Sequence, residues 1–346
     1  MNINERKTMN NLKKVGLSAL AGSLVAFSAS ASEVTITGGT QLVYSSQEGN
    51  QNSKGGSNGK GIGTQTDLSV NAGGELDNGF TVNFFMAINT DTTLSNSSSQ
   101  TTIGMGDMGT IVVTANNGGP ANAIDDVIPF AYEEAWDGTT HSANNHVFGA
   151  ATQDGSVSYI TPAIDVMGAS ISASATYDSA ANVERATASS VVSGASGTAY
   201  TVKIAHESGL TVGGGAEEVN NAGQGTTATT GAKVATGYVK YAAGPLSVGY
   251  QESYNNKADG AQDIASSGYG IAYTSGDMSF SYSEITDSQQ DIGSDTTHYD
   301  AEMSAVQATY TMGAMTAGIS FYETTNAGYA SAKEYEETEI SLSFAF

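Results

Sequence analysis

The sequence contains no cysteine, four prolines, one tryptophan and only 12 basic residues against 35 acidic ones. The absence of cysteine excludes a disulfide framework and thiol chemistry, so stability must come from burial and backbone pairing. The low proline content, without a collagen-type repeat, excludes a proline-rich disordered tract. The acidic excess excludes nucleic acid as a partner, because such a field repels phosphate groups.

Long apolar runs are also missing, except for one near the N-terminus. A positively charged start, an apolar run over residues 15–27 and a small-residue cleavage site at 29–31 follow one another. This order is typical of a secretory signal peptide, so we assign residues 1–31 to the signal and 32–346 to a single domain. The run is shorter than the roughly 20 residues that a spanning helix needs. A retained N-terminal anchor is the alternative.

The signal contains four of the 12 basic residues and one of the 35 acidic residues, so the remaining chain has a net charge of about −26. That chain is dominated by an alternation with a period of two residues. Apolar residues occupy every second position within 80–88, 246–250, 278–282, 315–321 and 340–346. Mostly small or polar residues lie between them. This pattern predicts strands with one apolar and one polar face.

The connections between these segments alternate between short and long. Short turns with Gly, Asn or Asp are predicted at 76–79, 106–109, 162–165, 207–209, 243–245, 275–277 and 312–314. Long polar loops are predicted near 46–63, 90–99, 114–147, 178–197, 219–231, 255–267, 287–300 and 325–334. Gly-containing turns of this kind close β-hairpins. The connections therefore predict about 16 antiparallel strands.

An even strand number, with short turns on one rim and long loops on the other, is typical of an outer-membrane β-barrel. A sheet in a bilayer must close, because lipid cannot pair with a free backbone edge. The predicted fold class is therefore all-β, a transmembrane antiparallel barrel. Aromatic girdles are predicted from Tyr44, Phe80, Tyr177, Tyr241, Tyr250, Tyr269 and Tyr310. The alternative is a secreted β-rich adhesin, but no fixed repeat is present, and the chain ends on an amphipathic strand.

The third long loop, residues 114–147, is the longest and differs in composition from the rest. It contains Pro120, Pro129 and the single tryptophan, and about half of its core is apolar. A loop of this length must pack on something, so we expect it to fold into the lumen. Phe130, Tyr132 and Trp136 are the residues expected to pack it there. The carboxylates expected to narrow the pore are Asp125, Asp126, Glu133, Glu134 and Asp137. A surface loop kept soluble by charge is the alternative.

Two lysines lie in the middle of predicted strands, Lys203 in TVKIA and Lys240 in GYVKYA. A lysine facing lipid at the bilayer midplane costs about 2–4 kcal/mol. Both side chains are therefore expected to point into the lumen and to form a thin positive wall opposite the third loop.

Other motifs favour no chemistry. The GxGxxG pattern at 104–109 precedes a predicted strand, whereas nucleotide binding needs a helix there. His141 and His146 do not have helical metal-ligand spacing. Asp291, Asp295 and Asp300 are weak Ca²⁺ candidates in a loop that we expect to be solvated. No set of catalytic residues emerges, so neither an enzyme nor a cofactor is predicted.

Four stretches resemble the general Gram-negative porins. In its overall sequence character the chain is most similar to the porins of alphaproteobacteria. The four stretches are ELDNGFTVNFFMAINTD (75–91), TTIGMGDMGTIVVT (101–114), GSVSYITPAIDVMGASISASATY (155–177) and SLSFAF (341–346). The resemblance implies a homotrimeric 16-stranded pore in the bacterial outer membrane, with the third loop folded inward. It also implies that the terminal strand, with Phe344 and Phe346, is recognised by the barrel-assembly machinery. Porins of this family usually carry an arginine cluster opposite the loop, whereas the only arginine after the signal is Arg185.

The predicted function is passive diffusion of ions and small hydrophilic solutes across the outer membrane. A preference for cations is expected, because rings of carboxylates select cations and this chain has few basic residues to balance its carboxylates. A substrate-specific channel, with solute stacking on Tyr132 and Trp136, is the alternative within the transport class.

Overall fold

The computed structural model describes residues 33–49, 58–89, 95–116, 119–125, 127–136, 155–181, 195–220, 232–256, 263–290, 299–331 and 333–346. These residues form one antiparallel sheet with three short 3₁₀ turns. The strands are β1 Glu33–Gly49, β2 Gly59–Glu75, β3 Thr81–Asn89, β4 Ser95–Gly104, β5 Thr110–Asn116, β6 Ser156–Ile160, β7 Ile164–Val166, β8 Ala169–Ala181, β9 Ala195–His206, β10 Leu210–Asn220, β11 Lys233–Ala243, β12 Leu246–Asn256, β13 Ile264–Ser275, β14 Met278–Gln289, β15 Ala301–Met312, β16 Met315–Thr325 and β17 Tyr335–Ala345. Within these ranges no helix is long and apolar enough to cross a membrane.

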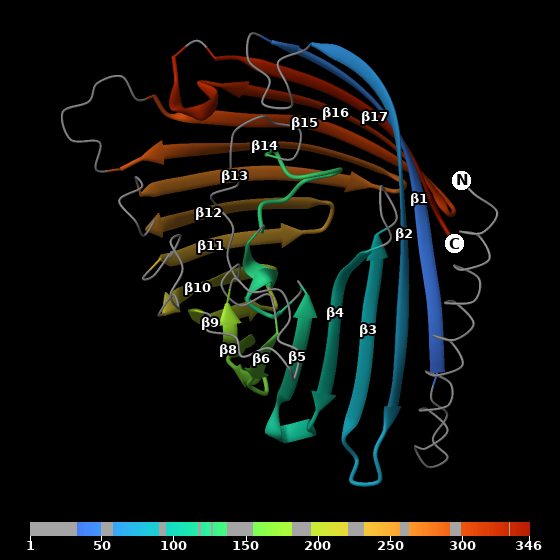
Figure 1. The fold of residues 1–346 in the computed structure, drawn as a ribbon, viewed down its shortest axis with the longest axis vertical. Helices are drawn as coiled ribbons and strands as arrows, with labels where there is room; N and C mark the ends of the chain where they lie inside the picture. Colours follow the sequence, from blue (N-terminus) through green and yellow to red (C-terminus); the bar gives the residue numbers. More distant parts are fainter. Residues whose placement is uncertain are drawn as a thin grey trace.

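The sheet closes on itself. Apart from the consecutive pieces β6 and β7, each strand pairs with its neighbours in sequence, and β17 returns to pair with β1 from Gly39 opposite Ala345 to Gly49 opposite Tyr335. Figure 1 shows the strands as a curved wall around an interior. The pieces β6 and β7 both pair with β8 and together make one spanning strand, so the barrel has 16 spanning strands. The predicted all-β transmembrane barrel fold is confirmed.

One predicted turn is wrong. The hairpin expected at 162–165 lies instead at Met167 and Gly168, both of which have positive φ. Pro162 has no N–H to donate, so it interrupts the strand between β6 and β7 rather than reversing the chain. The segment between β6 and β7 remains bonded to β8, because Thr161 donates its backbone N–H to the carbonyl of Ala173 at 2.9 Å.

The two faces of the sheet differ in the predicted way. On β12, Val248 and Tyr250 lie on the outward face, whereas Gly249 and Gln251 lie on the inward face. The same alternation continues across neighbouring strands, where large exposed hydrophobic residues mark the outward face. Serine, threonine, glycine and glutamine predominate on the inward face. A polar interior of this kind holds water, and an apolar exterior suits lipid.

Aromatic side chains pair across strands on the outward face. Tyr250 lies directly opposite Tyr269 near the middle of the strands, and Tyr273 lies opposite Phe280 towards the short turns. All four are exposed. The short connections share one rim with the start of β1 and the end of β17. The other rim carries the ends of the strands that lead into the long connections.

Candidate functional site

The third long connection lies inside the barrel. We call residues 119–136 the inner loop, of which all but residue 126 are described. It follows β5 and precedes β6, and Figure 1 shows it in the interior, away from the rim. The inner loop contacts the inward face of the barrel from β9 to β16, and it also reaches β1.

The first half of the inner loop is held by an apolar cluster and by Gln251. Ala121 and Ile124 are buried against Ala199 of β9 and Tyr238 of β11. The Gln251 amide donates to the carbonyls of Ile124 and Asp125 at 3.0 and 2.8 Å, and its oxygen accepts from the backbone N–H of Val127 at 3.2 Å. Gln251 is completely buried, so one side chain satisfies three polar groups of a loop that water does not reach there.

The middle of the inner loop lies on glycines of β12 and β13. A Cβ at Gly249 would lie 2.6 Å from Cδ of Pro129, and one at Gly270 would lie 2.4 Å from Cγ2 of Ile128. A Cβ at Gly268 would lie 2.3 Å from Cδ1 of Ile128. These distances are too short for real contacts, so glycine is required for the loop to approach so closely. Glycine within a strand often marks such an approach of another segment.

The second half is held by β14 and β15. The N–H of Ala131 donates to Ser281 Oγ at 2.8 Å. Gln307 accepts from the N–H groups of Ala131 and Tyr132 at 3.2 and 3.0 Å, and its amide donates to the carbonyl of Glu133. Gln307, like Gln251, is therefore a buried clamp on the loop backbone.

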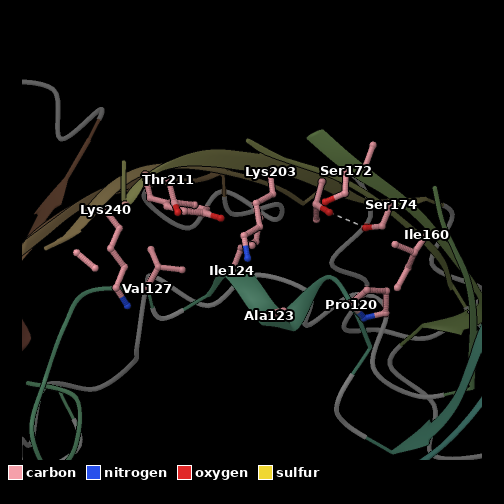
Figure 2. A pocket seen from close by; sticks show the side chains of 15 residues that line it. Pro120, Ala123, Ile124, Val127, Ile160, Ser172, Ser174, Lys203, Thr211 and Lys240 are labelled. Carbon is pink, nitrogen blue, oxygen red and sulfur yellow. Dashed lines mark hydrogen bonds between the residues drawn. The ribbon is translucent and has the colours of Figure 1, made fainter. Parts of the chain in front are cut away.

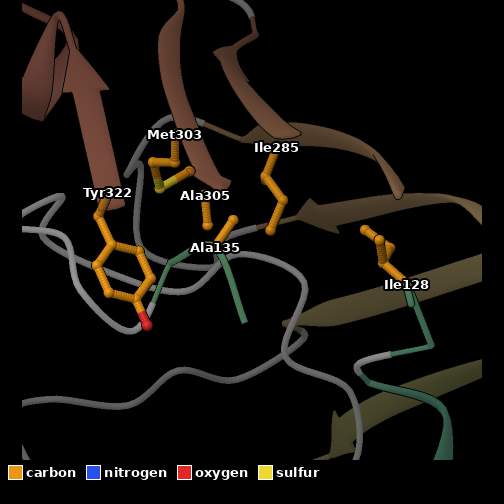
Figure 3. Packing of buried hydrophobic residues seen from close by; sticks show 6 residues of the cluster. All are labelled: Ile128, Ala135, Ile285, Met303, Ala305 and Tyr322. Carbon is orange, nitrogen blue, oxygen red and sulfur yellow. The ribbon is translucent and has the colours of Figure 1, made fainter. Parts of the chain in front are cut away.

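A second apolar cluster completes this anchor. Figure 3 shows Ala135 of the loop among Ile285, Met303, Ala305 and Tyr322 on β14 to β16, with Ile128 at one side. Trp136 is partly buried and packs against this cluster.

Tyr132 extends the contacts as far as the N-terminal strand. Its hydroxyl accepts a hydrogen bond from Gln41 of β1 at 3.0 Å, and its ring lies 2.9 Å from where a Cβ of Gly318 would be. Burial, together with the negative charges of Glu133 and Glu339, raises the pKa of Tyr132 to about 12. These contacts hold Tyr132 against the wall.

The prediction for Phe130 is wrong. Its side chain is 38% exposed, and it lies between two residues that contact the wall, Pro129 and Ala131. Phe130 therefore stays partly exposed rather than being enclosed between the loop and the wall.

Glu133 is half-buried beside other carboxylates. Burial raises the pKa of Glu133 above its ordinary value, and repulsion from Glu134 and Glu337 adds to this, while a hydrogen bond from Tyr322 opposes it. The Tyr322 hydroxyl lies 3.5 Å from Glu133 Oε2. Glu337 is itself only 2% exposed and is held by Ser45, by Gln47 at 2.9 Å and by Tyr335 at 2.7 Å. The loop and the wall thus share one acidic region.

Lys203 and Lys240 point into the lumen, as expected, but they do not lie on the wall opposite the loop, where we predicted them. Figure 2 shows both side chains directed towards Ile124 and Val127 of the inner loop. They line the same cavity as Pro120, so they lie on the wall that the loop covers. The prediction failed because position in a strand shows which face a side chain occupies but not where in the barrel that strand lies.

The other predicted positions divide between described and undescribed parts of the chain. Asp125 is partly buried, and its carbonyl is one of the groups held by Gln251. Asp126, Asp137, His141, His146, Arg185, Asp291, Asp295 and residues 1–31 lie outside the described residues. Asp300 is exposed, and among the residues described no three His, Cys, Asp or Glu side chains are grouped for a metal.

The C-terminal residues contribute to closing the barrel. The backbone of Phe346 exchanges two hydrogen bonds of 2.8 Å with Gly38 of β1, and its ring lies close to Gly38. Phe344 belongs to β17 and lies on the outward face.

Sequence reasoning missed the residues that hold the loop. Gln251, Gln307 and Gln41 lie in alternating strands that also contain many serines and threonines, so they did not stand out. The glycines at 249, 268, 270 and 318 carried a usable signal, because glycine in a strand interior often indicates close approach of another segment.

Comparison with known structures supports the same architecture. The chain matches OmpF of Salmonella typhi, solved with daunomycin, at 12% identity and a TM-score of 0.67, over 90% of this chain and 97% of that one. It matches a loop-deletion mutant of OmpT of Vibrio cholerae at 11% identity and a TM-score of 0.60, over 91% and 100% of the two chains. A mutant Rh. blastica porin matches at 12% identity and a TM-score of 0.56, with the same coverage.

No curated protein sequence matches the chain well enough to count as a relative. The family model of the Gram-negative porins, in contrast, matches residues 16–346. A match of this length, together with the closed barrel, excludes the secreted adhesin considered from composition. The protein therefore belongs to the Gram-negative porins, the channel-forming proteins of the bacterial outer membrane.

Proposed function

We propose that this porin is a cation-preferring diffusion channel for ions and small hydrophilic solutes, narrowed by the inner loop. The observation that carries the proposal is the position of Glu133 and Glu134 on a loop anchored inside the barrel, next to Glu337 of the wall. Carboxylates in a narrow, low-dielectric passage attract cations and repel anions.

The opposite wall offers little positive charge to balance these carboxylates. The inward face of β2 to β4 carries polar, mostly uncharged groups, with Asp67 and Glu75 as its charged members. Of the described basic residues, only Lys203 and Lys240 are directed inward, and both lie behind the first half of the loop. The passage beside Glu133 therefore has a net negative lining.

The selectivity is testable in planar bilayers under a KCl gradient. The wild-type protein is expected to give a reversal potential of the cation-selective sign, and E133Q/E134Q is expected to move it towards zero. E207Q, which removes an exposed carboxylate at a short turn, is the control and should leave the potential unchanged. An anion-selective potential for the wild-type protein would overturn the proposal.

The substrate-specific alternative receives less support from the loop. Tyr132 and Trp136, which we considered for stacking a solute, are engaged with the wall. Phe130 remains as an exposed aromatic side chain of the loop. Conductance that saturates with a neutral sugar or a peptide, and that F130A abolishes, would favour this alternative.

Biogenesis forms part of the proposal. We expect export by the signal at 1–31, insertion through the barrel-assembly machinery by the strand that ends in Phe344 and Phe346, and assembly into a homotrimer. Cross-linking of the native protein in outer membranes would test the trimer, and a monomer alone would contradict it. No cofactor is expected, and Ca²⁺ near Asp300 is not part of the proposal.

A further inference from the structure

A cavity of about 530 Å³ lies between the first half of the inner loop and the barrel wall. Pro120, Ile124 and Val127 line it on the loop side, and residues of β8 to β11 line it on the wall side. It includes Gly209 and Ala242, next to the short turns, so it lies on the short-turn side of the loop. Figure 2 shows this arrangement, with the wall arching over the loop segment.

The cavity contains the positive charge of the described lumen. Lys203 of β9 and Lys240 of β11 both direct their ammonium groups into it. Neither forms an ion pair with any residue in the described parts of the chain, whereas Lys233 on the outward face pairs with Glu218 at 3.2 Å. Because no carboxylate among the described residues pairs with the two lysines, their charges are available to an anion in the lumen.

The rest of the lining suits an organic anion. Ser172 lies opposite Lys203 in the sheet, and Thr211 lies opposite Lys240, so two hydroxyl groups line the same cavity as the two lysines. No aspartate or glutamate of the described chain lines the cavity, although acidic residues outnumber basic ones almost threefold. Ile124, Val127 and Ile160 add an apolar surface on which a short hydrocarbon segment can lie.

We infer that this cavity is a binding subsite for small organic carboxylates on the short-turn side of the constriction. The two ammonium groups attract the carboxylates, the hydroxyls donate hydrogen bonds, and the apolar loop residues cover the hydrocarbon part. The inference rests on the proposed function, because it requires solutes to enter the lumen. A local anion site is compatible with overall cation preference, because Glu133 and Glu134 lie on the second half of the loop and do not line this cavity.

The experiment uses the purified full-length porin in planar bilayers, with succinate as the probe. Potassium succinate is added to one side at a time, and the potassium current and its fluctuations are recorded at rising concentration. The expected result is a saturating reduction of the current, stronger when succinate is added on the short-turn side. K203Q/K240Q should raise the half-saturating concentration about tenfold, because two partly exposed charge contacts are lost.

Two matched variants separate charge from structure. K333Q removes a lysine in the connection before β17, which does not line the cavity, and should behave like the wild-type protein. K203R/K240R keeps both charges and should retain saturation. Heat-modifiable migration of every variant in gels shows that the barrels are folded. Inorganic phosphate and chloride serve as comparison anions, and succinate is expected to saturate at the lowest concentration because it alone carries a hydrocarbon segment.

A current that falls linearly with succinate, or that saturates equally in the wild-type protein and in K203Q/K240Q, would overturn the inference. Equal half-saturation by phosphate and succinate would overturn the assignment to organic carboxylates. The reversal potential of the wild-type protein in KCl is measured separately. An anion-selective reversal potential would overturn the proposed function. A cation-selective channel whose current does not saturate with succinate would overturn only the subsite.

Discussion

At the scale of single residues, two buried glutamines hold the inner loop. Gln251 and Gln307 each bind three backbone groups with one amide, which supplies both a donor and an acceptor at the same place. Glutamate would offer no donor for the carbonyl groups, and serine would be too short to reach several groups at once. The chemistry of the amide therefore suits an irregular segment that needs both kinds of partner.

Replacing Gln307 by leucine is expected to release the loop without opening the barrel. The N–H of Tyr132 and the carbonyl of Glu133 would lose their partner, at about 1–3 kcal/mol for buried groups left unsatisfied, whereas the N–H of Ala131 would keep Ser281. Single-channel recordings should show more frequent current fluctuations. Q100L on β4, a strand that is not among those holding the loop, is the control, and steady conductance in Q307L would contradict the clamp.

The raised pKa of Glu133 makes selectivity depend on pH. Because burial disfavours its charged form, Glu133 takes up a proton at a higher pH than an ordinary carboxyl group does. As pH falls through this raised pKa, the lumen loses negative charge and cation preference should decline. The same protonation stabilises the docked loop, since the cost of burying the charge is removed as pH falls.

Reversal potentials of the wild-type protein and E133Q between neutral and acid pH measure this effect. E133Q should lack the first decline on acidification, whereas E134Q should keep it. Identical pH profiles for the wild-type protein and E133Q would show that Glu133 does not line the conducting path.

At the scale of elements, the inner loop and the strands β12 and β13 fit as one surface. Ile128 and Pro129 of the loop occupy the space that side chains at Gly249, Gly268 and Gly270 would fill. None of these glycines has a positive φ, so their role is space for the loop and not a special backbone conformation. The shape of the wall thus sets the position of the loop along the barrel.

Gly270→Ala is expected to displace the loop. Its Cβ would approach Ile128 and the carbonyl of Pro129, and overpacking of this kind costs about 1–3 kcal/mol. Thermal unfolding should shift downwards, and the single-channel conductance should change. Gly237→Ala is the matched control, because a Cβ at Gly237 on β11 meets nothing within 4 Å. Equal stability and conductance in the two variants would contradict the fit.

The elements differ in how far the sequence predicts them. The strands were predictable because a wall between lipid and water imposes alternation on every strand, as in 246–250 and 278–282. The break at Pro162 was misplaced because proline is common both in turns and at strand interruptions. The inward course of the loop was expected from its length and apolar content. The contacts of the loop with Gln251 and Gln307 could not be expected, because these contacts depend on the register of strands that are distant in sequence.

At the scale of the whole molecule, closure depends on the two ends of the chain. The backbone of Phe346 exchanges two hydrogen bonds with Gly38, beyond the last residue of β17. Deletion of Phe346 is expected to remove this contact and to lower the yield of folded barrel in outer membranes. Heat-modifiable migration in gels measures that yield. Deletion of residue 331, in a connection at the opposite rim, is the control, and equal yields would contradict a role for the terminal residue.

The inner loop also has a consequence for the order of assembly. Its partners are 91 residues away at Gln41, 127 at Gln251 and 174 at Gln307, on strands that lie at both ends and in the middle of the chain. Contacts of such long sequence separation can form only after the intervening chain is placed. The full set of loop contacts is therefore complete only when β1 and the strands as far as β15 are all in place. The width of the passage is thus set by contacts that the chain forms late.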